Sequence, residues 1–326
     1  MSIAHPIVDL TLPGKHRLAV SFGKETTPAG TSFTIRKFRE DPYSIIDLIN
    51  IGTFSEEMAA YFWMCLENRS SIMVLGGTAA GKTTALNSLA CLIKPGSKIV
   101  TIEETAELNL PLENWVSLIA RQSYGLGGSN VGEVTLFDLV KTSMRHRPDI
   151  LVVGEVRGQE AYVLFQALAT GHGGMCTMHA ENLDSAVKRL TQKPMEISPA
   201  YIPLMNIVLP IQRVHLTKDN EKKAYRRVIT VNEIADYEDY RTTFKWHPAK
   251  DEHIMNLDES IIFSSISERQ GVTKKDLLEE IGRRKDILHW MRERNIRSYK
   301  DVAAIIAEYY ARPKIIYEKI LAGEEV

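Results

Sequence analysis

The segment GGTAAGKTTAL, residues 76–86, constrains this chain more than any other part of its sequence. It fits the pattern G-x-x-x-x-G-K-[ST], a loop whose backbone N–H groups surround phosphate oxygens. In that pattern the lysine neutralises the β- and γ-phosphates, and the threonine hydroxyl binds Mg²⁺. We therefore predict that a nucleoside triphosphate is bound by Gly76, Gly77, Thr78, Ala79, Ala80, Gly81, Lys82, Thr83 and Thr84, with Thr83 as a Mg²⁺ ligand.

The segments on either side of this loop have the character that a phosphate site requires. The apolar run SIMVLGG before it predicts a buried strand, and TTALNSLACLI after it has apolar residues at helical spacing. That helix would direct the positive end of its dipole at the phosphates. Strand, loop and helix in this order favour a phosphate site over the alternative, a chance glycine-rich turn.

Composition limits the compartment and the class of partner. The chain has 326 residues, 44% of them hydrophobic, and a formal net charge of −1, so no overall field attracts nucleic acid or an anionic membrane. Cys65, Cys91 and Cys176 form no C-x-x-C pair, which is typical of a reducing compartment. The sequence shows neither a signal-peptide pattern nor an apolar run of about 18 residues. We expect a cytoplasmic protein.

Periodicity predicts an α/β fold in three segments. Residues 1–42 read as short extended pieces, too small for a core of their own, and the break falls at Asp41-Pro42. Residues 43–230 alternate apolar strands with helices, which predicts a mostly parallel sheet covered on both faces. Residues 231–326 form the C-terminal part of the same domain, a hairpin and charged helices; the antiparallel hairpin joins PIQRVHLT to AYRRVITVNEIADY through KDNEKK, residues 218–223.

Two predicted strands end in acidic residues. Glu103 and Glu104 close IVTIEE, and Glu155 closes ILVVGE. A carboxylate at the tip of a strand beside a phosphate loop can bind Mg²⁺ through water or polarise the attacking water. The alternative for Glu155 is a surface salt bridge with Arg157, although a charge directly after four apolar residues favours a function.

A third segment, TGHGGMCTMHA, places His172 and His179 at the two ends of a glycine-led strand. We expect both to contact the nucleotide and to link the state of the γ-phosphate to movement, through hydrogen bonds that exist only with ATP. The alternative is that each packs as an ordinary structural histidine. Zinc is not expected, because no cysteine or second histidine with ligand spacing lies nearby.

Together these segments resemble the secretion ATPase superfamily of type II and type IV systems, which includes pilus and archaellum assembly motors. The family's four boxes occur in order: the phosphate loop, the acidic box at residues 102–108, the Glu155 box RPDILVVGEVRGQEA, and the histidine box at residues 170–180. The resemblance runs from about Ser32 to the C-terminus. The tail NIRSYKDVAAIIAEYYARPKIIYEKI is most similar to the archaeal branch.

The resemblance implies a RecA-like P-loop NTPase core, a short N-terminal β remnant and a C-terminal hairpin with a helical subdomain. It implies ATP hydrolysis with Mg²⁺ by a homohexamer on the inner face of the cell membrane, working with a polytopic platform protein of a pilus or secretion system. Glu103 matches the general base, and Glu155 would organise Mg²⁺ together with Thr83; the reverse assignment of the base stays open. Arg36 and Arg17 match arginines that the family directs at the nucleotide, the alternative being solvated strand charges.

Two departures and two other functions stay open. Many bacterial members carry a four-cysteine zinc insertion, which is absent here, and the N-terminal domain is shorter than usual, so the chain is either a fragment or a truncated form. A nucleic-acid translocase would need a basic pore loop with aromatic residues, whereas RQSYGLGGSN has one Arg and one Tyr, so nucleic acid is not expected as a partner. A regulatory module that binds ATP without turnover is disfavoured by the intact Lys82, Thr83, Glu103 and Glu155.

Overall fold

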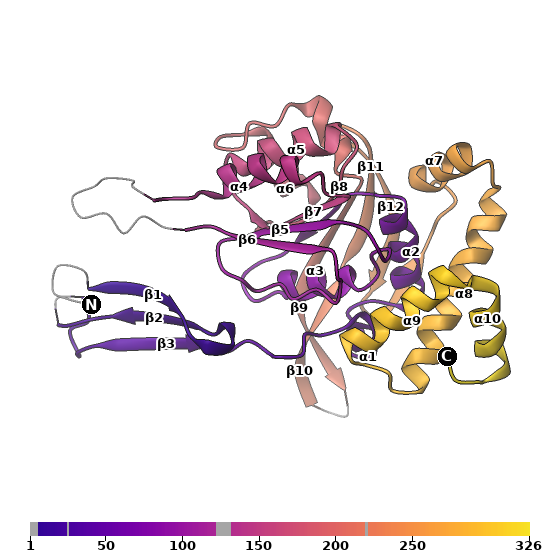
Figure 1. Ribbon diagram of the computed structural model, residues 1–326, viewed down its shortest axis with the longest axis horizontal. Coiled ribbons are helices and arrows are strands. Elements are labelled where there is room, and N and C mark those ends of the chain that lie inside the picture. Colours follow the sequence, from indigo (N-terminus) through magenta and orange to yellow (C-terminus); the bar gives the residue numbers. More distant parts are fainter. Residues whose placement is uncertain (1–5, 25, 122–131, 219–220) are drawn as a thin grey trace. The chain divides into compact units, whose positions relative to one another are not determined.

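A computed structural model describes residues 6–24, 26–121, 132–218 and 221–326 (Figure 1). The chain divides into two compact units, residues 1–42 and 43–326. Apart from its first residue, the segment RQSYGLGGSN lies outside the described residues. Among the described helices, none is both long enough and apolar enough to cross a membrane.

The first unit is a three-stranded antiparallel sheet in the order β1-β2-β3. Its strands are β1 (Ile7–Thr11), β2 (Arg17–Ser21) and β3 (Ser32–Arg36), with the short 3-10 turn η1 (Pro13–Lys15) between the first two. Because side chains alternate along a strand, the register gathers apolar residues on one face. These are Val8, Leu10, Leu18, Val20, Phe33 and Ile35.

The second unit is built around one mixed sheet of ten strands. Nine of them follow the order β13-β12-β11-β9-β4-β8-β7-β5-β6, and β10 pairs with β9 outside that path. The central strands β9, β4, β8, β7, β5 and β6 are parallel, whereas β10 to β13 add antiparallel pairs. The strands are β4 (Ile72–Leu75), β5 (Ile99–Glu103), β6 (Trp115–Ile119), β7 (Ile150–Val156), β8 (Gly173–Met178), β9 (Ile207–Lys218), β10 (Glu221–Val228), β11 (Thr230–Asp236), β12 (Asp239–His247) and β13 (Glu252–Met255).

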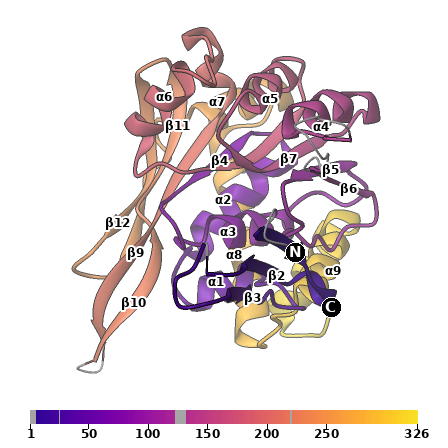
Figure 2. The same cartoon turned by 90° about the vertical axis from the view of Figure 1, so that its left-hand side faces the viewer.

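Helices cover both faces of this sheet (Figures 1 and 2). They are α1 (Ile45–Asn50), α2 (Glu56–Glu67), α3 (Lys82–Ala90), α4 (Leu136–Ser143), α5 (Glu160–Ala169), α6 (Leu183–Thr191), α7 (Ile261–Gln270), α8 (Lys274–Glu293), α9 (Tyr299–Ala311) and α10 (Pro313–Ala322), with 3-10 turns η2 (Met144–His146) and η3 (Pro199–Leu204).

Alternation along the buried strands sorts the side chains into two cores. On β4, Ile72 and Val74 join the core shared with α1 to α3 and α7 to α10, while Met73 and Leu75 join the core under α4 to α6. A strand buried on both faces reads as a continuous apolar run, which explains the pattern SIMVLGG. The predicted α/β fold with a mostly parallel sheet, a hairpin and C-terminal helices is confirmed.

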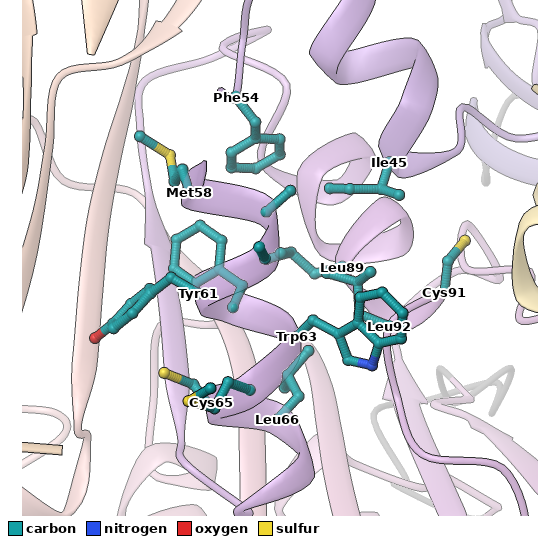
Figure 3. Close-up of a cluster of buried hydrophobic side chains, with 14 of the residues drawn as sticks. Ile45, Phe54, Met58, Tyr61, Trp63, Cys65, Leu66, Leu89, Cys91 and Leu92 are labelled. Carbon is teal, nitrogen blue, oxygen red and sulfur yellow. The ribbon is translucent and has the colours of Figure 1, made fainter. Parts of the chain in front are cut away.

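The C-terminal helices share a core with the N-terminal helix pair. Figure 3 shows buried side chains of α2, among them Tyr61 and Trp63, together with other aromatic and aliphatic residues of the same core. Trp63 Nε1 donates to Tyr310 Oη at 3.0 Å, which ties α2 to α9. Residues 43–326 therefore fold as one unit around the sheet.

The sequence did not predict one strand, β6, between the acidic box and the helix LFDLVKTSMRH. β6 pairs in parallel with β5, with Ile99 opposite Trp115. As the last strand of the sheet order it is only partly buried, so it lacks the long apolar run that marks the central strands.

Candidate nucleotide site

The phosphate loop connects β4 to α3 at the carboxyl end of the parallel strands. A Cβ on Gly76 would lie 2.7 Å from the Ile211 carbonyl oxygen, so no larger residue fits at that position. Gly81 has a φ of +95°, a left-handed conformation in which a side chain is strained, and it precedes the first residue of α3. The predicted order of strand, loop and helix is therefore present, and ligands of open α/β sheets bind at this edge.

Lys82 is the first residue of α3, and its side chain turns back over the loop. Its Nζ donates to the Gly77 carbonyl oxygen at 3.2 Å. Partial burial lowers the pKa of Lys82, while the nearby carboxylates of Glu155 and Glu107 oppose that shift. Two acids thus lie within electrostatic reach of the ammonium group, which a bound phosphate would also contact.

Glu103 is the last residue of β5 and is almost fully buried, with 4% of its surface exposed. Its Oε1 accepts hydrogen bonds from the backbone N–H groups of Glu107, at 3.0 Å, and Leu108, at 2.9 Å. Its Cγ lies 3.1 Å from the position of a Cβ on Gly154, so β7 leaves room for it. Glu103 therefore holds the acidic box in place, in addition to any role in chemistry.

Glu155 lies on β7, half-buried, where a register irregularity separates Val153 from Val156 in the pairing with β8. Its expected structural alternative was an ion pair with Arg157. Arg157 instead pairs with Glu104, and both of those side chains are exposed. Glu155 acts electrostatically on Lys82 instead.

His179 follows β8 directly and is exposed beside the phosphate loop. Its Nε2 lies 3.1 Å from Thr78 Oγ1, so a side chain of the histidine box contacts the loop itself. The backbone of His179 is held by α6, because its carbonyl oxygen accepts a hydrogen bond from Arg189 of that helix. A change in the position of Thr78 would therefore alter its contact with the His179 side chain.

His172 is not brought to this edge. It precedes β8, which has six residues, so the two histidines lie at opposite ends of the strand, roughly 23 Å apart along seven residues at about 3.3 Å each. His172 Nδ1 lies 3.0 Å from Thr170 Oγ1 and 3.1 Å from the Ala167 carbonyl oxygen, at the C-terminal end of α5. These contacts match the structural alternative that the sequence left open for His172.

Arg17 and Arg36 belong to the first unit. They are direct cross-strand partners, Arg17 at the start of β2 and Arg36 at the end of β3. The Arg36 guanidinium lies 5.0 Å from the centre of the Phe38 ring. The two arginines therefore lie side by side at one end of that sheet.

Four residues near the site were not found from the sequence. Glu107 faces Lys82. Glu160, near the end of the Glu155 box, stabilises the turn after β7, since its Oε1 accepts the N–H groups of Arg157 and Gly158, both at 2.7 Å. Arg189 supports His179, and Arg226 of β10 donates to the Ala79 carbonyl oxygen. Glu107, inside the acidic box, and Glu160, inside the Glu155 box, had a signal in the sequence, whereas Arg189 and Arg226 had none.

The oxygen atoms at this edge suit a hard cation. Mg²⁺ takes oxygen ligands, keeps several waters and is commonly bound by one or two protein groups plus substrate phosphates. Thr83, in the first turn of α3, and the half-buried Glu155 are oxygen donors of this kind. A Cβ placed on Gly77 would have no atom within 4 Å, so there is space beside the loop for a phosphate group. The residues present therefore fit a nucleotide with Mg²⁺.

The sequence of this chain matches one family model and several known proteins. The sequence model of the family described as "Type II/IV secretion system protein" matches residues 3–244. The chain is 38% identical over 321 residues to the uncharacterized protein MJ0900 of Methanocaldococcus jannaschii, a match that covers 96% of this chain and 57% of that protein. It is 32% identical over 261 residues to the conjugal transfer protein TrbB of Rhizobium radiobacter, covering 78% of this chain and 73% of that one.

A solved structure supports the fold. The pilus retraction motor PilT with bound ADP superposes with a TM-score of 0.50 at 18% sequence identity, over 70% of this chain and 66% of that chain.

Proposed function

Because the chain belongs to the type II/IV secretion system protein family, we propose that it is an ATP-hydrolysing motor that powers assembly of a type IV pilus-like filament or archaellum, or type II-like protein secretion. The observation that carries the proposal is the convergence at one sheet edge. The phosphate loop after β4, Glu103 of β5, Glu155 of β7 and His179 after β8 come from four neighbouring parallel strands.

The residues at this edge divide the work of phosphoryl transfer to water. Lys82 neutralises negative charge on the β- and γ-phosphates, and the loop N–H groups hold them in place. Thr83, and Glu155 through water, would hold Mg²⁺, which would supply charge neutralisation on the phosphate oxygens. Glu103 accepts the proton of the attacking water, and its two backbone hydrogen bonds keep the carboxylate from rotating away.

Coupling to movement is proposed to pass through His179. Its contact with Thr78 links the phosphate loop to the end of β8, and Arg189 links it on to α6. Loss of the γ-phosphate would alter the loop and so change this hydrogen bond.

The active form is proposed to be a homohexamer favoured by ATP, located at the inner face of the cell membrane and docked on a polytopic platform protein. A ring motor needs positive charge from outside the phosphate loop. Arg36 and Arg17, adjacent at one end of their sheet, are the arginines proposed to supply it.

The test is an ATPase assay with purified protein and Mg²⁺, with Lys82→Ala as the control without activity. One set of reactions receives the platform protein in detergent or vesicles, and a second receives single- or double-stranded DNA. We expect turnover to rise with the platform protein and to stay unchanged with DNA.

The DNA reactions are needed because a relative is named a conjugal transfer protein. Stimulation by DNA alone would favour the nucleic-acid translocase instead. ATP binding without turnover under every condition would favour a regulatory module.

A further inference from the structure

The β9–β10 ribbon reaches the phosphate loop from outside the catalytic boxes. Leu75, the last residue of β4, pairs with Pro210, and from Ile211 onward β9 continues beyond β4 with β10 as its antiparallel partner. Figures 1 and 2 show the two strands running together past the body of the sheet. Ile211, at the base of this ribbon, excludes any residue larger than glycine at position 76, because a Cβ there would lie 2.7 Å from its carbonyl oxygen.

Arg226 of β10 makes a second and more specific contact with the loop. Its Nε and Nη2 both donate to the Ala79 carbonyl oxygen, each at 3.2 Å. Its Cδ lies 2.9 Å from the position that a Cβ on Gly81 would occupy. The aliphatic stem therefore packs on Gly81 while the guanidinium holds Ala79, so one side chain spans the second half of the loop.

The carbonyl that Arg226 holds belongs to a peptide that the loop must keep in one orientation. Ala79 has a φ of +58°, an unfavourable conformation for a residue with a Cβ. The N–H on the other side of the same planar peptide, that of Ala80, donates to the Gly77 carbonyl oxygen at 3.3 Å. Without the hydrogen bonds from Arg226 to the Ala79 carbonyl oxygen, this strained turn would be less stable.

The charge around Arg226 indicates that the contact is not incidental. Arg226 lies directly opposite Arg213, and like charges at such positions destabilise a strand pair. Within the described part of the chain, Arg226 forms no ion pair with a carboxylate, and its contacts go to the phosphate loop. His215 and Lys222 are exposed on the same face of the ribbon.

We propose that Arg226 is a positioning residue for nucleotide binding: it fixes the Ala79–Ala80 peptide of the phosphate loop and thereby ties the β9–β10 ribbon to the nucleotide. The inference rests on the nucleotide site alone and not on which filament or export system the motor serves. It acts on ADP and ATP alike, because the loop holds the phosphates that both share.

The experiment compares Arg226→Ala and Arg226→Lys with Arg213→Ala. Arg213 is the matched control, because it has the same charge, faces the same side and lies directly across the ribbon. Binding of Mg·ADP is measured by calorimetry, and KM and kcat for ATP by turnover. We expect Arg226→Ala to weaken ADP binding about tenfold, which corresponds to about 1.4 kcal/mol. It should raise the KM for ATP more than it lowers kcat. Arg226→Lys should be intermediate, and Arg213→Ala should change binding less than about twofold.

Hydrogen exchange on the loop peptide in the nucleotide-free protein gives an independent measurement. Arg226→Ala should speed exchange across residues 77–81, whereas Arg213→Ala should not. If Arg226→Ala does not fold, Arg226→Gln, which keeps one N–H donor group, takes its place. Equal weakening by Arg213→Ala and Arg226→Ala would reduce the effect to general charge and overturn the proposal, as would unchanged ADP binding in Arg226→Ala.

Discussion

Replacing Glu103 in two different ways separates its chemical role from its structural role. Glu103→Gln keeps an oxygen that can accept the N–H groups of Glu107 and Leu108, but removes the base. Glu103→Ala removes the hydrogen-bond acceptor as well as the base. The Leu108 N–H is buried, and leaving it without an acceptor costs about 2 kcal/mol; the Glu107 N–H is partly accessible to water and costs about 1 kcal/mol.

Glu103→Ala should therefore lose about 3 kcal/mol of unfolding free energy, and its melting temperature should fall by roughly 5 °C. Glu103→Gln should lose less than about 1 kcal/mol. The glutamine variant should still bind ATP but turn it over on the order of a hundredfold more slowly or worse. The measurements are differential scanning calorimetry, ATP binding and steady-state turnover on the same preparations.

Glu104→Gln is the matched control, because Glu104 is adjacent, exposed and paired across the surface with Arg157. It should leave stability and turnover close to those of the wild type. Wild-type turnover in Glu103→Gln would refute the assignment of the base and transfer it to Glu155. Equal melting temperatures for the alanine and glutamine variants would refute the structural role.

Further variants test the remaining assignments. Lys82→Ala should abolish nearly all hydrolysis with the fold intact, since a charge-assisted phosphate contact is lost; wild-type turnover at unchanged stability would reject it. Glu155→Gln should slow turnover and shift its Mg²⁺ dependence, and a Mg²⁺ titration that superimposes on that of Glu103→Gln would contradict the division of roles. His179→Ala should bind ATP but fail in hydrolysis or filament assembly, whereas His172→Ala should change melting alone, because its contacts lie at the far end of β8; a melting loss that accounts for the whole His179→Ala defect counts against coupling. Arg36→Ala should lower turnover more than ATP affinity in concentrated protein, and equal wild-type activity in dilute monomer and concentrated protein would argue against a shared site.

Much of the nucleotide site is predictable from the sequence because its signals are local. The loop at residues 76–83 depends on glycine conformation, one lysine and one hydroxyl within a few residues of one another. Apolar strands buried on both faces likewise predict the parallel sheet. The edge strand β6 escaped notice because a half-buried strand lacks that continuous apolar run.

The positions of the two histidines show what local sequence patterns cannot predict. The sequence places both at the ends of one strand, and that is confirmed by β8. Only the parallel pairing of β4 with β8 reveals that the carboxyl end is the one beside the phosphate loop, which brings His179 to Thr78 and leaves His172 at the opposite end.

The sequence by itself therefore determined the class of fold and the family and predicted a phosphate loop between a strand and a helix, because these depend on residues that are close together along the chain. Only the tertiary structure decided that Arg157 pairs with Glu104 and not with Glu155, and that Arg226 holds Ala79 from 147 residues away. Such contacts depend on strand order and register, which are set by the packing of the whole sheet and not by any one segment.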